Sequence, residues 1–192
     1  MLKTVLKLTP ATCLLLSTST LATPSIEQIK KRAAEINELK ALIQSPDPSL
    51  RLAAIDAMQN SEDLAMREIA FAAGINASDE SVVAVTIRNR ISEIDNFAVL
   101  LTKPEGNDEA MKTYNNYGSK VMFRIRSYDK AKGTFVNDTH YDGSDKTSTI
   151  SGLNLFLESS RCQGDFKLAE DLSYKGAITC SGAQFPAVIN LF

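Results

Sequence analysis

The spacing of hydrophobic residues along the chain changes near residue 95. Between Pro24 and Ser92 apolar side chains recur every three or four positions, which is the period of helices buried on one face. Beyond residue 95, short runs of alternating apolar and polar residues are separated by glycines, as in β-strands and their turns. The pattern predicts an α+β protein, in which a helical module precedes a small antiparallel β-sandwich or barrel.

The first helix is expected to run from about Ile26 to Ile43. Ser25 and Gln28 have the spacing of a capping box, in which the two side chains satisfy each other's backbone N–H groups. Five apolar residues fall on one face of this helix: Ile26, Ile29, Ala33, Ile36 and Ile43. Pro46 ends the stretch, because proline disrupts a helix interior.

Three consecutive sixteen-residue segments then repeat one pattern without gaps. They read SPDPSLRLAAIDAMQN at residues 45–60, SEDLAMREIAFAAGIN at 61–76 and ASDESVVAVTIRNRIS at 77–92. One column holds an aspartate in each segment, namely Asp47, Asp63 and Asp79. Each aspartate is expected to cap a helix by accepting a backbone hydrogen bond near the positive end of the helix dipole. Each segment therefore predicts a helix of about eleven residues followed by a short turn.

The apolar positions of the three segments also fall into columns. These columns are Leu50, Met66 and Val82; Ala53, Ile69 and Val85; and Ile55, Phe71 and Ile87. A column of small residues holds Ala54 and Ala70, with Thr86 in the third segment. Small side chains allow helix axes to approach closely, so we expect the helices to stack on one another.

The phrases SPDPSLRLAAIDAM and SEDLAMREIAFAAG resemble the α-repeats of HEAT-like and armadillo-like solenoids, over residues of about 45–92. The third segment departs from that pattern at Val83 and Asn89. The resemblance implies protein–protein interaction through a stacked helical surface, and no catalysis. So few helices would leave an apolar end open, which the next domain, a second copy or a partner would cover. The alternative is an ordinary four-helix bundle with incidental periodicity.

The second half of the chain is interpreted as a linker at residues 96–118 and an antiparallel β domain at residues 119–192. The linker interpretation follows from the polar, turn-rich composition of residues 102–118, whereas residues 97–101 are apolar and also compatible with a strand. Six or seven strands are expected, with candidates at Lys120–Tyr128, Thr134–Asn137, Thr147–Glu158, Phe166–Leu168, Tyr174–Ser181 and Phe185–Leu191. This half resembles no family that we recognise.

Residues 1–22 have the character of a secretory signal peptide. Two lysines precede an apolar stretch centred on Leu15, and small residues then lead to an expected cleavage site after Ala22. The apolar stretch is shorter than the roughly 20 residues of a membrane span, which disfavours a membrane anchor. The helical module would therefore occupy residues 23–95 of a periplasmic or secreted protein.

Composition narrows the chemistry that the chain can perform. With 21 basic and 23 acidic residues there is no overall positive field, so we expect no nucleic-acid partner. His140 is the only histidine, which excludes sites that need two. No phosphate-binding loop, dinucleotide fingerprint or Cys/His metal spacing is present, so no cofactor is expected. After removal of the signal, Cys162 and Cys180 remain and are expected to form a structural disulfide.

The most concentrated polar cluster surrounds His140. Asp138, Asp142 and Asp145 could offer oxygen ligands to calcium, but their spacing matches no standard calcium loop. His140 and an aspartate could activate Ser144 as a nucleophile, but the G-x-S-x-G turn is missing. The Asp, Asn and Gly content favours an exposed hairpin loop without a metal or catalytic role.

Cationic residues and one tyrosine are the candidates for partner binding: Arg51, Arg67, Arg88, Arg90, Arg124, Arg126 and Tyr128. Solvated faces of helices and of an antiparallel sheet are the simpler interpretation of the same residues. Together the patterns predict a non-enzymatic adaptor or inhibitor-type protein of the cell envelope, whose partner is another envelope or secreted protein. A small secreted hydrolase or a ligand-binding β domain is the alternative function.

Overall fold

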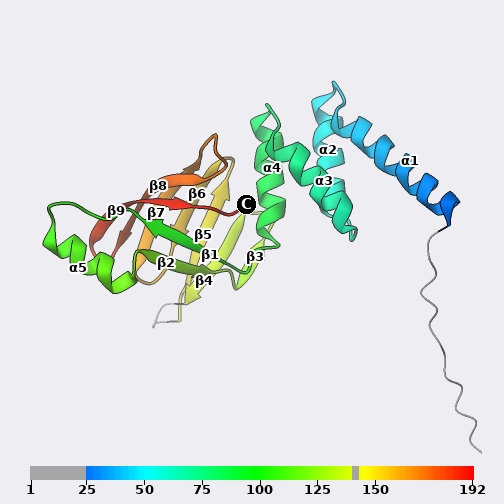
Figure 1. Ribbon diagram of the computed structural model, residues 1–192. Helices are drawn as coiled ribbons and strands as arrows, with labels where there is room; N and C mark the ends of the chain where they lie inside the picture. Colours follow the sequence, from blue (N-terminus) through cyan, green and yellow to red (C-terminus); the bar gives the residue numbers. More distant parts are fainter. Residues whose placement is uncertain (1–24, 140–142) are drawn as a thin grey trace, which may run out of the picture. The chain divides into compact units, whose positions relative to one another are not determined.

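The computed structural model describes residues 25–139 and 143–192 of the chain. The expected signal peptide at residues 1–22 lies outside the described residues, as do His140 and Asp142. The described part contains five helices and nine strands, in the order α1 to α4, β1, α5 and β2 to β9 (Figure 1). The expected α+β layout is confirmed. None of the helices in this part is long and apolar enough to cross a membrane.

The first four helices begin at the caps that the sequence pattern predicts. Their bounds are α1 (Ile26–Ile43), α2 (Pro48–Gln59), α3 (Leu64–Ile75) and α4 (Glu80–Ile91). In α1, Ser25 and Gln28 form the capping box, with N–H to side-chain distances of 2.8 and 3.2 Å. The Oδ1 atoms of Asp47, Asp63 and Asp79 each accept a hydrogen bond from the N–H two residues later, at 2.8, 2.9 and 2.9 Å.

The helices from the end of α1 to α4 share a core of their own. Its buried members are Ile43, Ala54, Ile55, Met58, Met66, Ala70 and Val82. The three residues of the small column, Ala54, Ala70 and Thr86, are all buried. Helices α3 and α4 approach closely where Gly74 lies directly against the side chain of Thr86. Small residues therefore set the spacing of these helices.

Substitution of Gly74 by alanine is expected to destabilise the protein by about 2 kcal/mol, through overpacking. A β-carbon at this position would overlap the Thr86 hydroxyl, which is fully buried and donates to Val82 O at 2.8 Å. In an open helix the same change would stabilise by about 1 kcal/mol. Thermal unfolding checks the sign, and the double variant G74A/T86A should recover part of the loss.

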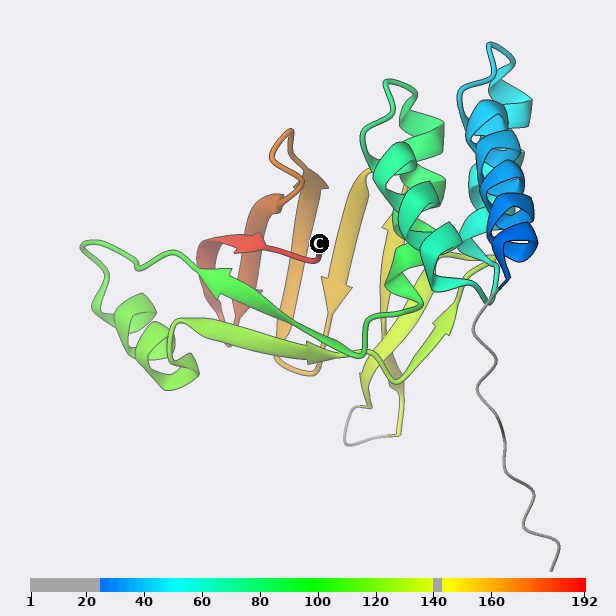
Figure 2. The same cartoon turned by 45° about the vertical axis from the view of Figure 1, so that its right-hand side comes forward.

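The nine strands form one antiparallel sheet, in the order β2-β1-β9-β8-β7-β6-β5-β4-β3, curled into a half-barrel (Figure 2). The first strands are β1 (Asn96–Leu101), β2 (Lys120–Arg124), β3 (Ser127–Asp129), β4 (Thr134–Thr139) and β5 (Asp145–Ser151). They are followed by β6 (Asn154–Glu158), β7 (Cys162–Leu168), β8 (Tyr174–Cys180) and β9 (Ala183–Ile189).

The two terminal strands of the sheet, β2 and β3, come from one stretch of chain. The pattern predicts a single strand there, whereas the structure divides it at Ile125 and Arg126. Ile125 N–H donates to Asp95 O beside β1 at 2.8 Å, and Arg126 N–H donates to Val136 O on β4 at 2.9 Å. The chain therefore leaves one edge of the sheet and joins the other, which brings the two edges together at this corner.

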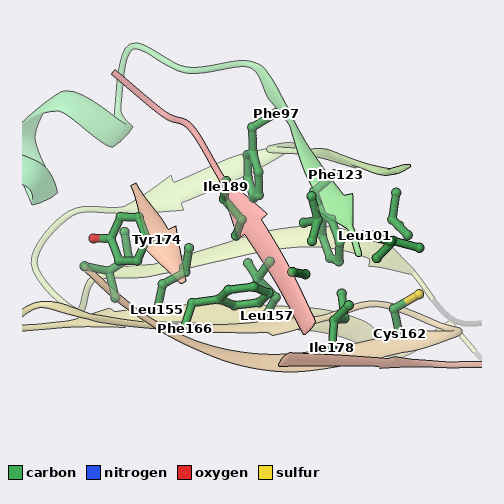
Figure 3. Close-up of a cluster of buried hydrophobic side chains, with 14 of the residues drawn as sticks. Phe97, Leu101, Phe123, Leu155, Leu157, Cys162, Phe166, Tyr174, Ile178 and Ile189 are labelled. Carbon is green, nitrogen blue, oxygen red and sulfur yellow. The ribbon is translucent and has the colours of Figure 1, made fainter. Parts of the chain in front are cut away.

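The concave face of the sheet is filled by side chains (Figure 3). Phe97, Phe123, Leu157, Phe166 and Ile178 are buried and lie between the opposed strands. At one end of this core the expected disulfide joins β7 and β8, because Cys162 and Cys180 are paired directly across the two strands. The prediction of a disulfide-tied β domain is confirmed.

Helix α4 belongs to two cores. Val82 packs in the helical core, while Val83, Ile87 and Ile91 pack in the core of the sheet. This explains why the third repeat departs from the pattern: Val83 occupies the column of the half-buried Arg51 and Arg67 but is buried on the sheet side. The β domain therefore covers the end of the helical stack at α4.

Residues 96–118, interpreted as a linker, contain regular structure. Residues 96–101 form β1, an internal strand that pairs with both β2 and β9 and buries Phe97, Val99 and Leu101. Helix α5 (Asp108–Tyr117) follows, within the polar stretch that was interpreted as a linker. The strand was hard to predict because its partners lie far along the chain, and short apolar runs fit either a strand or a helix.

Candidate functional site

The helical part contains a groove of about 620 Å³. It lies between the C-terminal end of α1, the first turn of α2, helix α3 and the turn that joins α3 to α4. Its lining residues are Lys40, Ile43, Gln44, Arg51, Ile69, Ala72, Ala73, Ala77, Ser78 and Asp79.

The groove is lined by small and apolar side chains and edged by charged ones. Alanines contribute Ala72, Ala73 and Ala77, so the backbone of a bound segment could approach α3 closely. Arg51 lies within 3.7 Å of Asp79 across the groove. Lys40 is exposed and forms no ion pair with any described residue. The unneutralised charge in the groove is therefore positive.

Arg51 and Arg67, predicted as partner-binding residues, perform one structural task in successive repeats. The Nη1 of Arg51 donates to Ser45 O at 2.8 Å, and the Nη1 of Arg67 donates to Ser61 O at 3.3 Å. Each guanidinium thus holds the turn that precedes its own helix. Arg67 also pairs with Glu93 at 3.2 Å. Of the two, only Arg51 lines the groove.

Arg90 on α4 and Tyr128 on β3 are engaged within the protein, whereas the Nε of Arg88 is buried without a hydrogen-bond partner among the described residues. Arg90 pairs with Glu68 at 2.8 Å and with Glu93 at 2.5 Å, and its guanidinium lies 4.8 Å from the centre of the Phe71 ring. Tyr128 donates to Arg88 O at 2.9 Å, which ties β3 to α4. Burial raises the pKa of Tyr128 to about 12, although the nearby Arg88 acts in the opposite direction. The phenol is therefore a permanent donor at neutral pH.

The remaining two candidates for partner binding, Arg124 and Arg126, lie at the end of β2 and in the connection to β3. Arg126 lies within 3.9 Å of Asp138, whereas Arg124 is exposed and lines a second, smaller hollow. The seven predicted residues are therefore distributed over several surfaces and do not form one site. Sequence reasoning missed Lys40 and the groove alanines. Of these alanines, only Ala73 shares its repeat column with another alanine, Ala57, so the sequence carried little signal for them.

The acidic cluster around residue 138 is only partly described. Ser160 Oγ donates to Asp138 Oδ2 at 2.6 Å, and Asp138 also approaches Arg126. His140 and Asp142, the other members of the proposed calcium or catalytic cluster, lie outside the described residues. Among residues 25–139 and 143–192, no group of three histidine, cysteine, aspartate or glutamate side chains could hold a metal ion.

Any functional proposal for this chain rests on the geometry of the helical groove and of the sheet. No protein-family model matches the chain, and the search of curated proteins found no match.

Proposed function

We propose that the protein is an exported, non-enzymatic adaptor that binds a helix of another envelope or secreted protein in the groove between α1 and α4. The observation that carries the proposal is the groove itself, about 620 Å³ in volume, with alanines in its lining and Lys40, which pairs with no described residue, at its edge. The buried disulfide fits an oxidising compartment outside the cytoplasm.

The chemistry of the groove favours an amphipathic helix with acidic residues. Such helices place an apolar face in a groove and are anchored by residues three or four positions apart. Ile43 and Ile69, with the alanines, supply an apolar surface for that face. Lys40 and Arg51 would face the acidic residues of the partner. Arg51 is already oriented by its hydrogen bonds to Ser45 O and Pro46 O, so it would lose little side-chain freedom on binding.

A large side chain in the groove should weaken the interaction, because it would occupy the space of the bound helix. Ala72 is exposed on α3 and lines the groove, so Ala72→Arg should fold normally while filling the site. Ala57 is exposed on α2 outside the groove, and Ala57→Arg adds the same charge as a matched control. In affinity capture from envelope extracts, we expect a protein recovered with the wild type and A57R to fall about tenfold with A72R, as for loss of a central contact.

A comparison of A72R with A57R can also contradict the proposal. If A72R and A57R recover the same proteins in the same amounts, the groove is not the binding surface. Circular dichroism at 222 nm and thermal unfolding of both variants would show that any loss is local.

A further inference from the structure

A second hollow lies between two open strand edges of the half-barrel. It has a volume of about 320 Å³ and is lined by residues of β2, β4, α5 and the segment 159–162 between β6 and β7. Strand β2 ends the sheet on one side, and β3 pairs with β4 only over Thr134–Val136. Within the described residues, no strand pairs with the outer edge of β2 or continues the β3 edge past Val136.

The direction of the free backbone groups follows from the hydrogen bonds at the two ends of β2. Ser119 O accepts from Leu101 N–H at 2.9 Å, and Ile125 N–H donates to Asp95 O. In an antiparallel pair these bonds alternate, so the odd-numbered residues of β2 face β1. The even-numbered residues, including Met122, therefore present N–H and C=O groups to the other side. Arg126 confirms this direction, because its N–H donates to Val136 O on β4.

A buried acceptor without a donor lines the same hollow. Asn137 is only 6% exposed, and its Nδ2 donates to Ser148 Oγ and to Glu158 O. Its Oδ1 has no hydrogen-bond partner among residues 25–139 and 143–192. Buried polar atoms almost always form a hydrogen bond, so we expect this oxygen to accept one from an N–H group of a ligand. Asn137 also lies where the β4–β5 register shifts, and such bulges often mark sheet edges and functional sites.

The free charges around the hollow are positive. Arg124 and Arg161 line it, and neither forms an ion pair with a described residue. Lys120, on the same edge of β2, is likewise exposed and unpaired among the described residues. The acidic residue in the lining, Asp138, is held by Ser160 and lies near Arg126. A ligand at this edge should therefore be acidic.

We propose that an extended acidic segment of a partner protein adds as a β-strand between β2 and β4. Its backbone would bond to the free groups of β2, and one of its N–H groups would satisfy Asn137 Oδ1. Acidic side chains would pair with Arg124 and Arg161, while apolar side chains on the other face would meet the Val121 and Phe123 side of the hollow. The site is separate from the helical groove, so neither proposal depends on the other.

The probe for this site is a phage-displayed library of random dodecapeptides, selected on the signal-free protein. We expect the selected peptides to carry acidic residues at alternate positions. Met122→Pro removes one free N–H from the edge without affecting the bonds to β1, and Met122→Thr keeps that N–H as the matched control. In fluorescence anisotropy, a selected peptide should bind M122P about tenfold more weakly than the wild type, as for one lost backbone hydrogen bond, and M122T about equally.

A second variant tests the site without a proline, in case M122P does not fold. The exposed pair Arg124→Glu and Arg161→Glu should also weaken binding about tenfold, while the groove variant A72R should leave it unchanged. Failure to select acidic peptides, or equal binding to wild type, M122P and R124E/R161E, would overturn the proposal. A dimer in light scattering that M122P converts to monomer would assign the edge to a second copy of the chain, and would overturn it as well.

Discussion

Replacing both Cys162 and Cys180 by alanine is expected to lower the free energy of unfolding by about 3 kcal/mol. The disulfide closes a loop with a sequence separation of 18 and joins the paired ends of β7 and β8. In the chain-entropy model, opening such a loop gives the unfolded chain more conformations and so favours unfolding. Urea denaturation of the wild type and the double variant, followed by circular dichroism, measures the difference directly.

The reduced wild-type protein is the control for this prediction. It retains both sulfur atoms, so it separates loss of the covalent bond from loss of buried volume at Cys162 and Cys180, which are 4% and 0% exposed. We expect reduced wild type and the alanine variant to show similar urea midpoints. Equal midpoints for oxidised and reduced wild type would contradict a stabilising role for the bond.

The same bond should influence the proposed strand-binding edge. Cys162 lines the hollow between β2 and β4, and its Sγ lies 3.9 Å from Tyr117 Oη on α5. The preceding residues, including Arg161, form the rim of that hollow. The disulfide therefore anchors the segment that carries one of the two arginines, which links the stability of the β domain to the geometry of its edge.

The helical half of this fold could be predicted because its determinants are local. A capping aspartate bonds to an N–H only two residues away, so the column of Asp47, Asp63 and Asp79 identified three helix starts. The sheet was predicted only in outline, since strand pairing depends on residues far apart in sequence. Phe97 to Leu101 illustrates this difference: the alternation fits a strand, but only pairing with β2 and β9 shows that the strand is internal.

The candidate sites were harder to predict, because charge alone does not distinguish a binding residue from a structural one. Arg51 and Arg67 hold the turns before their helices, and Arg90 is fixed between two glutamates. The groove instead takes its shape from alanines, which carry no chemical signal of their own. The open edge at β2 depends on which strands pair across the curled sheet, and the local pattern does not specify that pairing.

Helix α4 packs in both hydrophobic cores, one below each proposed binding surface. Its first turn contributes to the helical core through Val82, and Asn89 near its C-terminus donates to Asp56 Oδ1 and Gln59 Oε1 at 2.9 and 3.0 Å. Its other face packs in the core of the half-barrel. Because one helix completes both cores, the helical stack from α2 to α4 and the sheet should unfold together.

Substitution of Ile87 by alanine tests this coupling and should cost about 3 kcal/mol, within the range for large-to-small core changes. Ile87 is 0% exposed and belongs to the core of the sheet, whereas Ile55, in the same repeat column, is 1% exposed and belongs to the helical core. I55A is therefore the matched control. Urea unfolding would be followed by circular dichroism at 222 nm for the helices and by tyrosine fluorescence for the sheet, where Tyr174 is fully buried.

With coupled cores, each variant shifts both signals to the same new midpoint, because the loss of packing on either side of α4 destabilises the whole unit. With independent cores, I55A would lower only the helical midpoint and leave the fluorescence transition at its wild-type position. That second outcome would show that the β domain covers the end of the repeat without sharing its cooperativity, and that the two binding surfaces can be destabilised separately.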